Sequence, residues 1–333
     1  YAASLVLPSL TASGALSRRT VGAVSGRLMS QALFGDAIFL AAWLGLRHRH
    51  AGRRRRAAAL GGLALALLAV YVDAYHVEPR MLRVRFHALD RAGERPGRSL
   101  RILHLTDIQA ATIGPHEERA LRAGLEASPD LIVMTGDYVE AALGADTEAG
   151  EAAALRALMR RLGFGAPLGV FATDGDAGPS CREALADLPV RCLADESVVV
   201  PLRDGDTLSI TGLSRTRGRE RDPAWLARLL ERGPTCRHQL VISHAPDFVD
   251  ALPVKVDLVL AGHTHGGQVV IPFFGPPVTA SRLPRRYAAG LHDFGGIPLH
   301  VSRGIGMERA FSPPVRFLCP PEICILDVRL PAP

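Results

Sequence analysis

The apolar residues of this chain follow two different patterns, which divide it into two parts. Near the N-terminus, Leu28–Leu46 and Ala57–Tyr75 are almost continuously apolar, and each is about as long as a helix that crosses a bilayer. Beyond Tyr75 the apolar runs are short and are separated by polar residues. We therefore predict a membrane region over residues 1–77, with transmembrane helices at 28–46 and 57–75, and an α/β domain over residues 78–333.

Short apolar runs in the second part have the length of buried strands. Five of them are Ser99–Leu105, Asp130–Thr135, Gly169–Ala172, His238–Ser243 and Val256–Ala261. Between the first two, Pro115–Ser128 carries proline and acidic residues in its first turn and apolar residues at helical spacing. A strand, a helix and a strand in this order predict parallel strands joined by a crossover. Upstream, Arg80–Ala88 alternates as an edge strand does.

An aspartate or a histidine follows each of these five runs. In parallel α/β sheets, ligands bind outside the carboxyl ends of the strands, so we expect these side chains to meet in one crevice. The set consists of Asp107, Asp137, Asp176, His244, His263 and His265. Carboxylates and imidazoles are ligands for ions such as zinc, iron and manganese, so the six together predict a metal site.

Each residue of this set, taken singly, has a commoner explanation. An aspartate after a strand is usually a turn residue or a helix cap, which is our interpretation of Asp174. A single histidine beside an apolar run is usually a hydrogen-bonded core residue, and we assign His104, His116 and His238 to structure or solvent. The pair in Gly262–Gly267 (GHTHGG) is more specific, because two rings on one face of a continuing strand would both be able to contact one ion.

The order of these motifs resembles that of the calcineurin-like metallophosphoesterases. Asp257–Gln268 (DLVLAGHTHGGQ) and Pro314–Leu326 (PVRFLCPPEICIL) are most similar to the membrane-associated bacterial branch of that family, and the resemblance extends from Glu78 to Leu330. It implies a two-sheet sandwich flanked by helices, here preceded by a transmembrane helical hairpin. It also implies two divalent ions (Mn, Fe or Zn) between the strand ends.

The resemblance also assigns the ligands and their roles. Asp137 would bridge the two ions and, with His263, would act in catalysis through a metal-bound water. The first ion would take Asp107 and His265, with Gln109 at the family's remaining histidine position, and the second ion would take Asp176, His244 and His263.

Two residues depart from the family pattern. Gln109 stands where the family has a histidine ligand, and an amide oxygen is a weaker, uncharged ligand. Ala177 stands where the family has a histidine that stabilises the transition state or protonates the leaving group, and such an acid contributes about 10²–10⁴-fold to the rate. The sequence therefore predicts a metal-dependent phosphoester hydrolase of reduced activity. The alternative is a binding module that keeps the fold and holds one metal ion or none.

The distribution of charge favours a membrane protein over a nucleic-acid-binding protein. The net charge is +6, but residues 47–56 hold six arginines and no acid, and the rest of the chain balances at 33 basic and 33 acidic residues. We therefore predict no nucleic-acid partner. Short arginine-rich loops stay in the cytoplasm, so a loop at 47–56 predicts a multi-pass membrane protein with the catalytic domain on the extracytoplasmic side. A site near a bilayer suits a phosphoester substrate that is a lipid or a cell-envelope precursor.

The chain has five cysteines, an odd number, so they cannot all pair within it. Cys181 and Cys192 flank a short segment and would be able to form a disulfide in an oxidising compartment. Cys319 and Cys324 lie by a C-terminal strand and are interpreted as core residues. None of the five belongs to the predicted metal site.

Overall fold

The computed structural model describes residues 18–94, 97–140, 145–202, 205–232, 236–309 and 312–331. The chain divides into two compact units, one of residues 1–81 with Glu308–Phe317 and the other of Leu82–Met307 with Leu318–Pro333. The first 17 residues of the predicted membrane region lie outside the described residues. The domain boundary at residue 77 stays a prediction.

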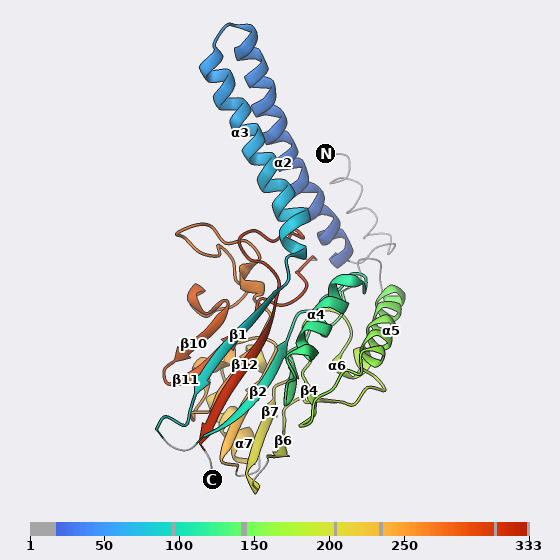
Figure 1. Cartoon of the computed structure of the whole chain (residues 1–333), viewed down its shortest axis with the longest axis vertical. Coiled ribbons are helices and arrows are strands. Elements are labelled where there is room, and N and C mark those ends of the chain that lie inside the picture. Colours follow the sequence, from blue (N-terminus) through green and yellow to red (C-terminus); the bar gives the residue numbers. More distant parts are fainter. Residues whose placement is uncertain are drawn as a thin grey trace. The chain divides into compact units, whose positions relative to one another are not determined.

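The first unit contains two long helices that form a hairpin (Figure 1). They are α2 (Arg18–His50) and α3 (Arg54–Val72), and a π-helical turn, η1 (Asp73–Val77), and a 3-10 turn, η2 (Glu78–Arg80), continue from α3. The helices pack through aromatic side chains: the rings of Phe34 and Tyr71 are 6.0 Å apart, and the Tyr75 hydroxyl donates to Ser30 Oγ at 2.6 Å. By length and composition, Leu28–His50 and Arg54–Arg80 can each cross a membrane.

The connection between these helices is shorter than predicted. Residues 47–56 were expected to form a loop, but only residues 51–53 are outside the helices, since α2 ends at His50 and α3 begins at Arg54. Arginine is a good helix former, and the basic residues of the last turn of α2 interact favourably with the helix dipole. The six arginines therefore remain together at one end of the hairpin.

The second unit is a sandwich of two six-stranded sheets, which confirms the predicted fold class. The strands of the first sheet, in spatial order, are β1 (Arg83–Asp90), β12 (Glu322–Pro331), β2 (Gly97–Leu105), β3 (Leu131–Met134), β4 (Val170–Ala172) and β5 (Val190–Cys192). Those of the second are β10 (Gly290–Phe294), β11 (Ile297–Val301), β9 (Leu258–Ala261), β8 (His238–Ile242), β7 (Thr207–Gly212) and β6 (Glu196–Pro201). All five predicted buried strands are present, with ends shifted by at most two residues.

Parallel pairing brings the carboxyl ends of the central strands to one edge of each sheet. Strands β2 to β5 are parallel to one another, and so are β7, β8, β9 and β11. The predicted crossover helix is α4 (Pro115–Glu126), which joins β2 to β3. Leu100 and Ile102 of the first sheet pack with Leu240 and Leu258 of the second to form the inner core.

Helices cover the outer faces of both sheets. On the first sheet, α4 and α5 (Ala145–Arg161) contribute the buried side chains Leu121 and Leu155 to a core that contains Leu103 of β2. On the second sheet, α7 (Pro223–Arg232) contributes Leu226 in the same way. Burial of a leucine side chain is worth about 1.5–3 kcal/mol, so these contacts fix the helices on the sheets.

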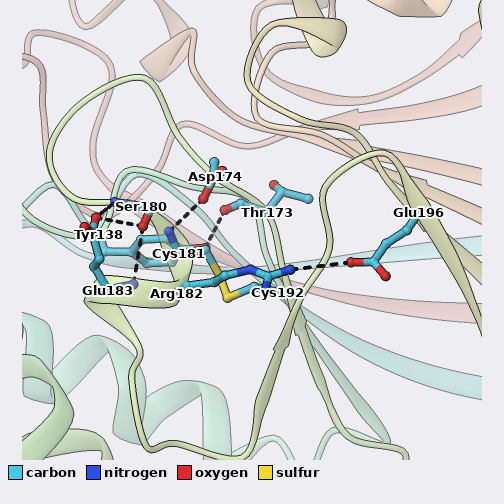
Figure 2. Close-up of a disulfide and its surroundings, with 9 residues drawn as sticks. All are labelled: Tyr138, Thr173, Asp174, Ser180, Cys181, Arg182, Glu183, Cys192 and Glu196. Atoms are coloured by element: carbon cyan, nitrogen blue, oxygen red, sulfur yellow. Dashed lines mark hydrogen bonds and ion pairs between the residues drawn. A yellow bond between two sulfur atoms is a disulfide. The ribbon is translucent and has the colours of Figure 1, made fainter.

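A disulfide between Cys181 and Cys192 joins the short helix α6 (Cys181–Ala184) to β5 (Figure 2). It realises the pairing that the spacing allowed. Just before α6, the Asp174 carboxylate accepts a hydrogen bond from the Cys181 amide at 2.7 Å, and Ser180 and Glu183 cap the helix. Asp174 is therefore a turn residue, as predicted. The loop that follows β4 and carries Asp176 is thus held at its far end.

Candidate metal centre

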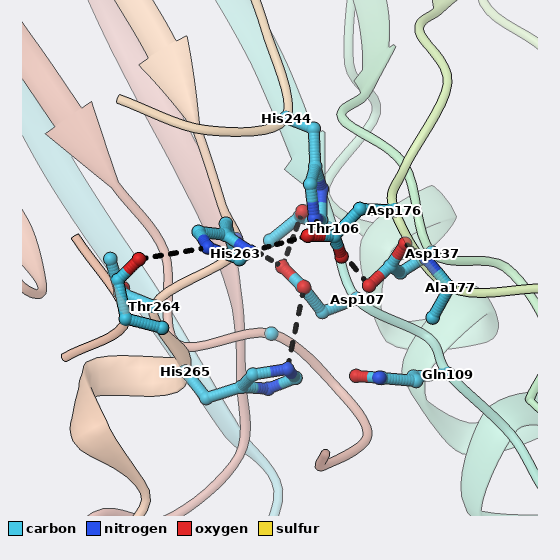
Figure 3. A network of polar contacts seen from close by, with 12 residues as sticks. Thr106, Asp107, Gln109, Asp137, Asp176, Ala177, His244, His263, Thr264 and His265 are labelled. Carbon is cyan, nitrogen blue, oxygen red and sulfur yellow. Dashed lines mark hydrogen bonds and ion pairs between the residues drawn. The ribbon is translucent and has the colours of Figure 1, made fainter. Parts of the chain in front are cut away.

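The structure brings the six predicted aspartates and histidines together at the carboxyl ends of strands from both sheets (Figure 3). From the first sheet, Asp107 follows β2, Asp137 follows β3 and the Asp176 loop follows β4. From the second sheet, His244 follows β8, and His263 and His265 follow β9. Strands of the two sheets thus end close together, and this places candidate ligands from both sheets around one crevice.

His244 lies at the middle of the cluster. Its Nε2 atom is 3.2 Å from Asp176 Oδ1 and 3.5 Å from Asp137 Oδ2, and His263 Nδ1 is 3.6 Å from Asp176 Oδ2. One ligand atom from each of Asp176, His244 and His263 lies within 4.8 Å of the others, and the same holds for Asp107, Asp137 and His244. His244, which the resemblance assigns to the second ion alone, therefore faces both sets of carboxylates.

His265 and Gln109 complete the side of the cluster near Asp107. His265 Nε2 lies 3.5 Å from Asp107 Oδ1. Gln109 is fully buried, its amide nitrogen donates to Glu140 Oε2 at 3.0 Å, and its amide points toward His265 (Figure 3). The hydrogen bond orients the amide so that the nitrogen faces Glu140. Gln109 lies beside the other candidate ligands, and its role as a ligand stays a prediction.

Hydrogen bonds from neighbouring groups orient the candidate ligands. The His244 ring donates through Nδ1 to the carbonyl of Thr135 at 2.8 Å, which directs Nε2 at the carboxylates. Asp107 Oδ2 accepts from the Thr106 hydroxyl at 2.6 Å and from the His263 amide at 3.0 Å. The Ala177 amide donates to Asp137 Oδ1 at 2.8 Å. Each carboxylate therefore keeps an oxygen for another partner.

The backbone of the crevice is bent into the left-handed region at five candidate residues. The φ angles are 46° at Asp107, 39° at Gln109, 52° at Asp137, 69° at His263 and 48° at His265. Such conformations cost about 1–3 kcal/mol each and cluster at functional sites. The expectation of a continuing strand beneath the two histidines was wrong, because β9 ends at Ala261 and the chain turns at Gly262 to aim both rings inward.

Close packing around the crevice requires glycine at two positions. A Cβ atom on Gly175 would lie 1.9 Å from Asp137 Oδ1, and one on Gly262 would lie 2.0 Å from Thr106 Oγ1 and 2.3 Å from Asp107 Oδ2. Both contacts are far shorter than van der Waals distance, so any side chain there would displace a candidate ligand.

The charges of the cluster fit divalent cations. Burial, with the nearby carboxylates, raises the pKa of Asp137 to about 7 and also raises the pKa of Asp107. Burial alone would lower the pKa of His244, but the three surrounding carboxylates raise it to about 10. Asp107 Oδ1 is buried and accepts no hydrogen bond from any described residue. Buried carboxylates that compete for a proton on one imidazole form a donor set whose charge a cation would neutralise.

Two arginines at the crevice were not among the predicted residues. Arg215 donates to the Asp176 carbonyl, and Arg219, at the end of η4 (Arg217–Arg219), is hydrogen-bonded to the Asp176 carboxylate and lies 2.8 Å from His263 Nε2. They belong to the connection after β7, which has no apolar run that ends in a ligand. Their position in an arginine-rich chain gave no sequence signal.

The sequence comparison agrees with this arrangement. Residues 100–267, which contain all the candidate ligands, match the sequence model of a family described as calcineurin-like phosphoesterase. The chain belongs to the calcineurin-like phosphoesterase family. The family uses divalent metals, and this chain holds groups of residues that can bind them.

Relatives in this family cover most of the chain. An uncharacterized metallophosphoesterase of Bacillus subtilis (strain 168), YkuE, is 28% identical over 282 residues, which are 81% of this chain and 94% of the relative. The phosphodiesterase YaeI of Escherichia coli (strain K12) is 28% identical over 241 residues, 68% of this chain and 82% of the relative. The UDP-2,3-diacylglucosamine pyrophosphatase LpxG of Chlamydia trachomatis serovar D is 25% identical over 338 residues, 81% of this chain and 96% of the relative.

Proposed function

We propose that this protein is a membrane-anchored, divalent-metal-dependent phosphoester hydrolase that acts on a lipid or a lipid-linked envelope precursor. The observation that carries the hydrolase proposal is the convergence of Asp107, Asp137, Asp176 and three histidines at the strand ends, with carboxylate oxygens and ring nitrogens 3.2–3.6 Å apart. Two bound divalent ions (Mn, Fe or Zn) would supply an activated water and would neutralise the phosphate oxygens.

The protein's own groups hold and orient the reacting parts. Asp137 would hold both ions, as the resemblance implies: its Oδ1 is fixed by the Ala177 amide, and its Oδ2 faces His244, which both groups of candidate ligands share. His263 is suited to the role of a metal ligand. Burial lowers its pKa to about 3, so its ring is neutral and able to act as a ligand. Gln109 and His265 face the first ion position.

Ala177 offers no acid for the leaving group, whereas Arg215 and Arg219 place positive charge beside Asp176. A guanidinium stays protonated near neutral pH, so it stabilises negative charge without giving up a proton. We therefore expect substrates with acidic leaving groups to be favoured. A series of aryl phosphates should give rates that fall steeply as the pKa of the leaving phenol rises, and a flat series would contradict this assignment.

An exposed apolar loop beside the crevice supports a lipid substrate. In residues 271–278, Phe273 is fully exposed and Ile271, Phe274 and Val278 are also exposed, while the Arg285 guanidinium lies 4.4 Å from the Phe274 ring. The same segment leads to Ala280, whose carbonyl is 3.1 Å from His263 Nε2. An apolar surface edged by arginine suits acyl chains next to an anionic headgroup. The relative LpxG is named for a substrate with two acyl groups.

The first unit supports a membrane location for the protein. Its two helices expose large apolar side chains along their length, among them Leu33, Phe39, Leu65 and Leu68. The six arginines at one end of the hairpin favour the cytoplasm, and this orientation would put the catalytic domain on the extracytoplasmic side. The Cys181–Cys192 disulfide is consistent with an oxidising compartment.

The hydrolase proposal is tested with the full chain purified in detergent. We expect bound divalent metal and hydrolysis of soluble aryl phosphomono- or diesters, both lost on treatment with a chelator, and activity lost in Asp137→Asn. A folded protein that binds metal but hydrolyses neither ester would support the binding-module alternative. A protein that binds no divalent metal would reject the hydrolase proposal and leave the binding module without metal.

The lipid proposal is tested separately with Phe273→Ser. In nanodiscs that contain a phospholipid substrate, we expect this variant to lose most of its activity toward the lipid and to keep its activity toward a soluble aryl phosphate. Val199→Ser, which removes an exposed apolar side chain on β6, is the matched control. Equal effects of the two variants on both substrates would reject the lipid-contact role of the loop.

A further inference from the structure

A second cluster of metal-binding side chains lies between the two sheets, apart from the candidate metal centre. His87 of β1 and Cys324 of β12 come from the first sheet, and His300 of β11 comes from the second. One ligand atom from each lies within 4.8 Å of the other two. His300 and Cys324 are fully buried and His87 is half-buried. None of the three belongs to the catalytic crevice.

The key atom of this cluster is His300 Nε2. It is buried and has no hydrogen-bond partner among the described residues. The other nitrogen of the same ring, Nδ1, lies 2.9 Å from His104 Nδ1, and His104 Nε2 lies 2.9 Å from Thr135 Oγ1. An unpartnered polar atom in a protein core costs about 1–3 kcal/mol, so a partner for this atom is to be expected.

The hydrogen-bond chain explains how His300 is prepared as a ligand. If His300 Nδ1 donates to His104 Nδ1, then His104 Nε2 carries its proton and donates to Thr135, and His300 Nε2 presents a lone pair. Burial lowers the pKa of His104 to about 3 and lowers that of His300 as well, so both rings are neutral. A ring that ligates through one nitrogen while the other donates to a fixed acceptor is the usual arrangement of metal-binding histidines.

We infer that His87, His300 and Cys324 form a second transition-metal site, which takes Zn²⁺ between the two sheets. Imidazole nitrogen and thiolate sulfur are both zinc ligands, with ligand distances of about 2.0–2.3 Å, and three protein ligands leave a fourth position for water. The three atoms lie within 4.8 Å of one another, so they must close slightly onto an ion, and the half-buried His87 on an edge strand can move to do so. On binding, the Cys324 thiol loses its proton to solvent and the sulfur–metal bond forms.

This ion would act on the fold rather than on the substrate. It would join the edge strand β1 to β12 and would join the first sheet to β11 of the second. The site shares no ligand with the candidate metal centre, although Thr135 contacts both: its hydroxyl meets His104 and its carbonyl accepts from His244. The inference therefore stands independently of the proposed hydrolase activity.

Cobalt provides a test that distinguishes the two sites, because only the second site contains a cysteine. The full chain in detergent is stripped with a chelator and titrated with Co²⁺. We expect the near-ultraviolet absorption band of a cobalt–thiolate bond in the wild-type protein and its loss in Cys324→Ser. The matched controls Cys236→Ser and Cys319→Ser, which alter the other two free cysteines, should keep the band.

A second variant covers the case in which Cys324→Ser does not fold. His87→Ala changes a half-buried residue on an edge strand and should lose the band or shift it, and it should bind one zinc ion per chain less than the wild type by elemental analysis. Zinc should also raise the thermal midpoint of the wild type by more than that of His87→Ala, which keeps the candidate metal centre. The inference is overturned if the folded wild-type protein shows no thiolate band, which is the result expected if a buried water is the partner of His300. So does a band that persists in Cys324→Ser.

Discussion

Removal of metal should make the stability of this protein fall steeply as the pH rises through neutrality. In the metal-free cluster the pKa of His244 is raised to about 10, from an ordinary value of 6.5. A group whose pKa is higher in the folded state stabilises the fold at low pH, and that contribution is lost as the pH rises from its unfolded pKa toward its folded one. Asp137, whose pKa is raised from 3.8 to about 7, acts in the same direction over a lower range.

The size of the effect follows from the His244 shift. Between about pH 6 and about pH 9, His244 alone gives a loss of about 3 kcal/mol, because each unit of pKa is worth about 1.4 kcal/mol. This loss corresponds to a fall of roughly 6–12 °C in the thermal midpoint of a domain of this size. Asp137 adds about 1 kcal/mol to this loss below about pH 8, whereas the pKa of His104 is lowered to about 3, so its effect on stability appears only below about pH 6.5.

The assay is thermal unfolding of the full chain in detergent, followed by circular dichroism at several pH values. In the presence of a chelator we expect the midpoint to fall as calculated, and with saturating Mn²⁺ we expect the fall to be removed, because bound metal takes the place of the His244 proton. His244→Gln should lose the part of this fall that lies above about pH 8 in chelator, where Asp137 is already ionised. The reasoning is refuted if the metal-free midpoint is flat or rises between these pH values, or if His244→Gln keeps the same slope.

Three further predictions concern single residues of the crevice. Gly175→Ala, which places a Cβ atom against the Asp137 carboxylate, should lower kcat/KM by about 10²-fold or more, whereas Gly165→Ala, which meets only ordinary contacts, should leave it unchanged. Arg219→Ala should lower kcat/KM toward an aryl phosphate by about 10- to 100-fold, and Arg219→Lys should restore part of it. If Arg219→Ala were as active as the wild type, the arginine would only hold Asp176 in place. Gln109→His should tighten Mn²⁺ binding by about 10- to 100-fold in competition with a chelator, and unchanged affinity would show that this position is not a ligand.

The strand ends could be predicted from the sequence because an apolar run and the polar residues that follow it both mark the same point. The buried strands are short, continuously apolar runs, and the first polar residue after each run marks its carboxyl end. Asp107, Asp137 and His244 could therefore be placed in one crevice before the structure was known. The turn after β9 could not be predicted in the same way. The left-handed backbone at His263 and His265 depends on contacts of Gly262 with Thr106 and Asp107, which are distant in sequence.

Contacts between the two sheets also could not be predicted from the sequence. His104 was assigned to structure or solvent and is fully buried, but its partner His300 lies 196 positions away and on the other sheet. The apolar run Ser99–Leu105 predicts that His104 is on a buried strand. It does not show that the His104 and His300 rings meet edge to face across the sandwich, nor that Cys324 lies beside them. The prediction of the helix ends in the hairpin failed for a different reason, since arginine is both a helix former and a typical loop residue.

The two departures from the family pattern lie on one side of the crevice, and the structure gives them different consequences. Gln109 keeps an amide oxygen at this position, so under the proposed function the loss there would be one of metal affinity. Ala177 keeps only its backbone amide, which holds Asp137, while Arg219 of the second sheet's connection places positive charge beside Asp176. An arginine stabilises negative charge but cannot protonate a poor leaving group near neutral pH. If the protein is a hydrolase, as we propose, we therefore expect it to keep charge neutralisation without proton transfer and to favour leaving groups that depart without a proton.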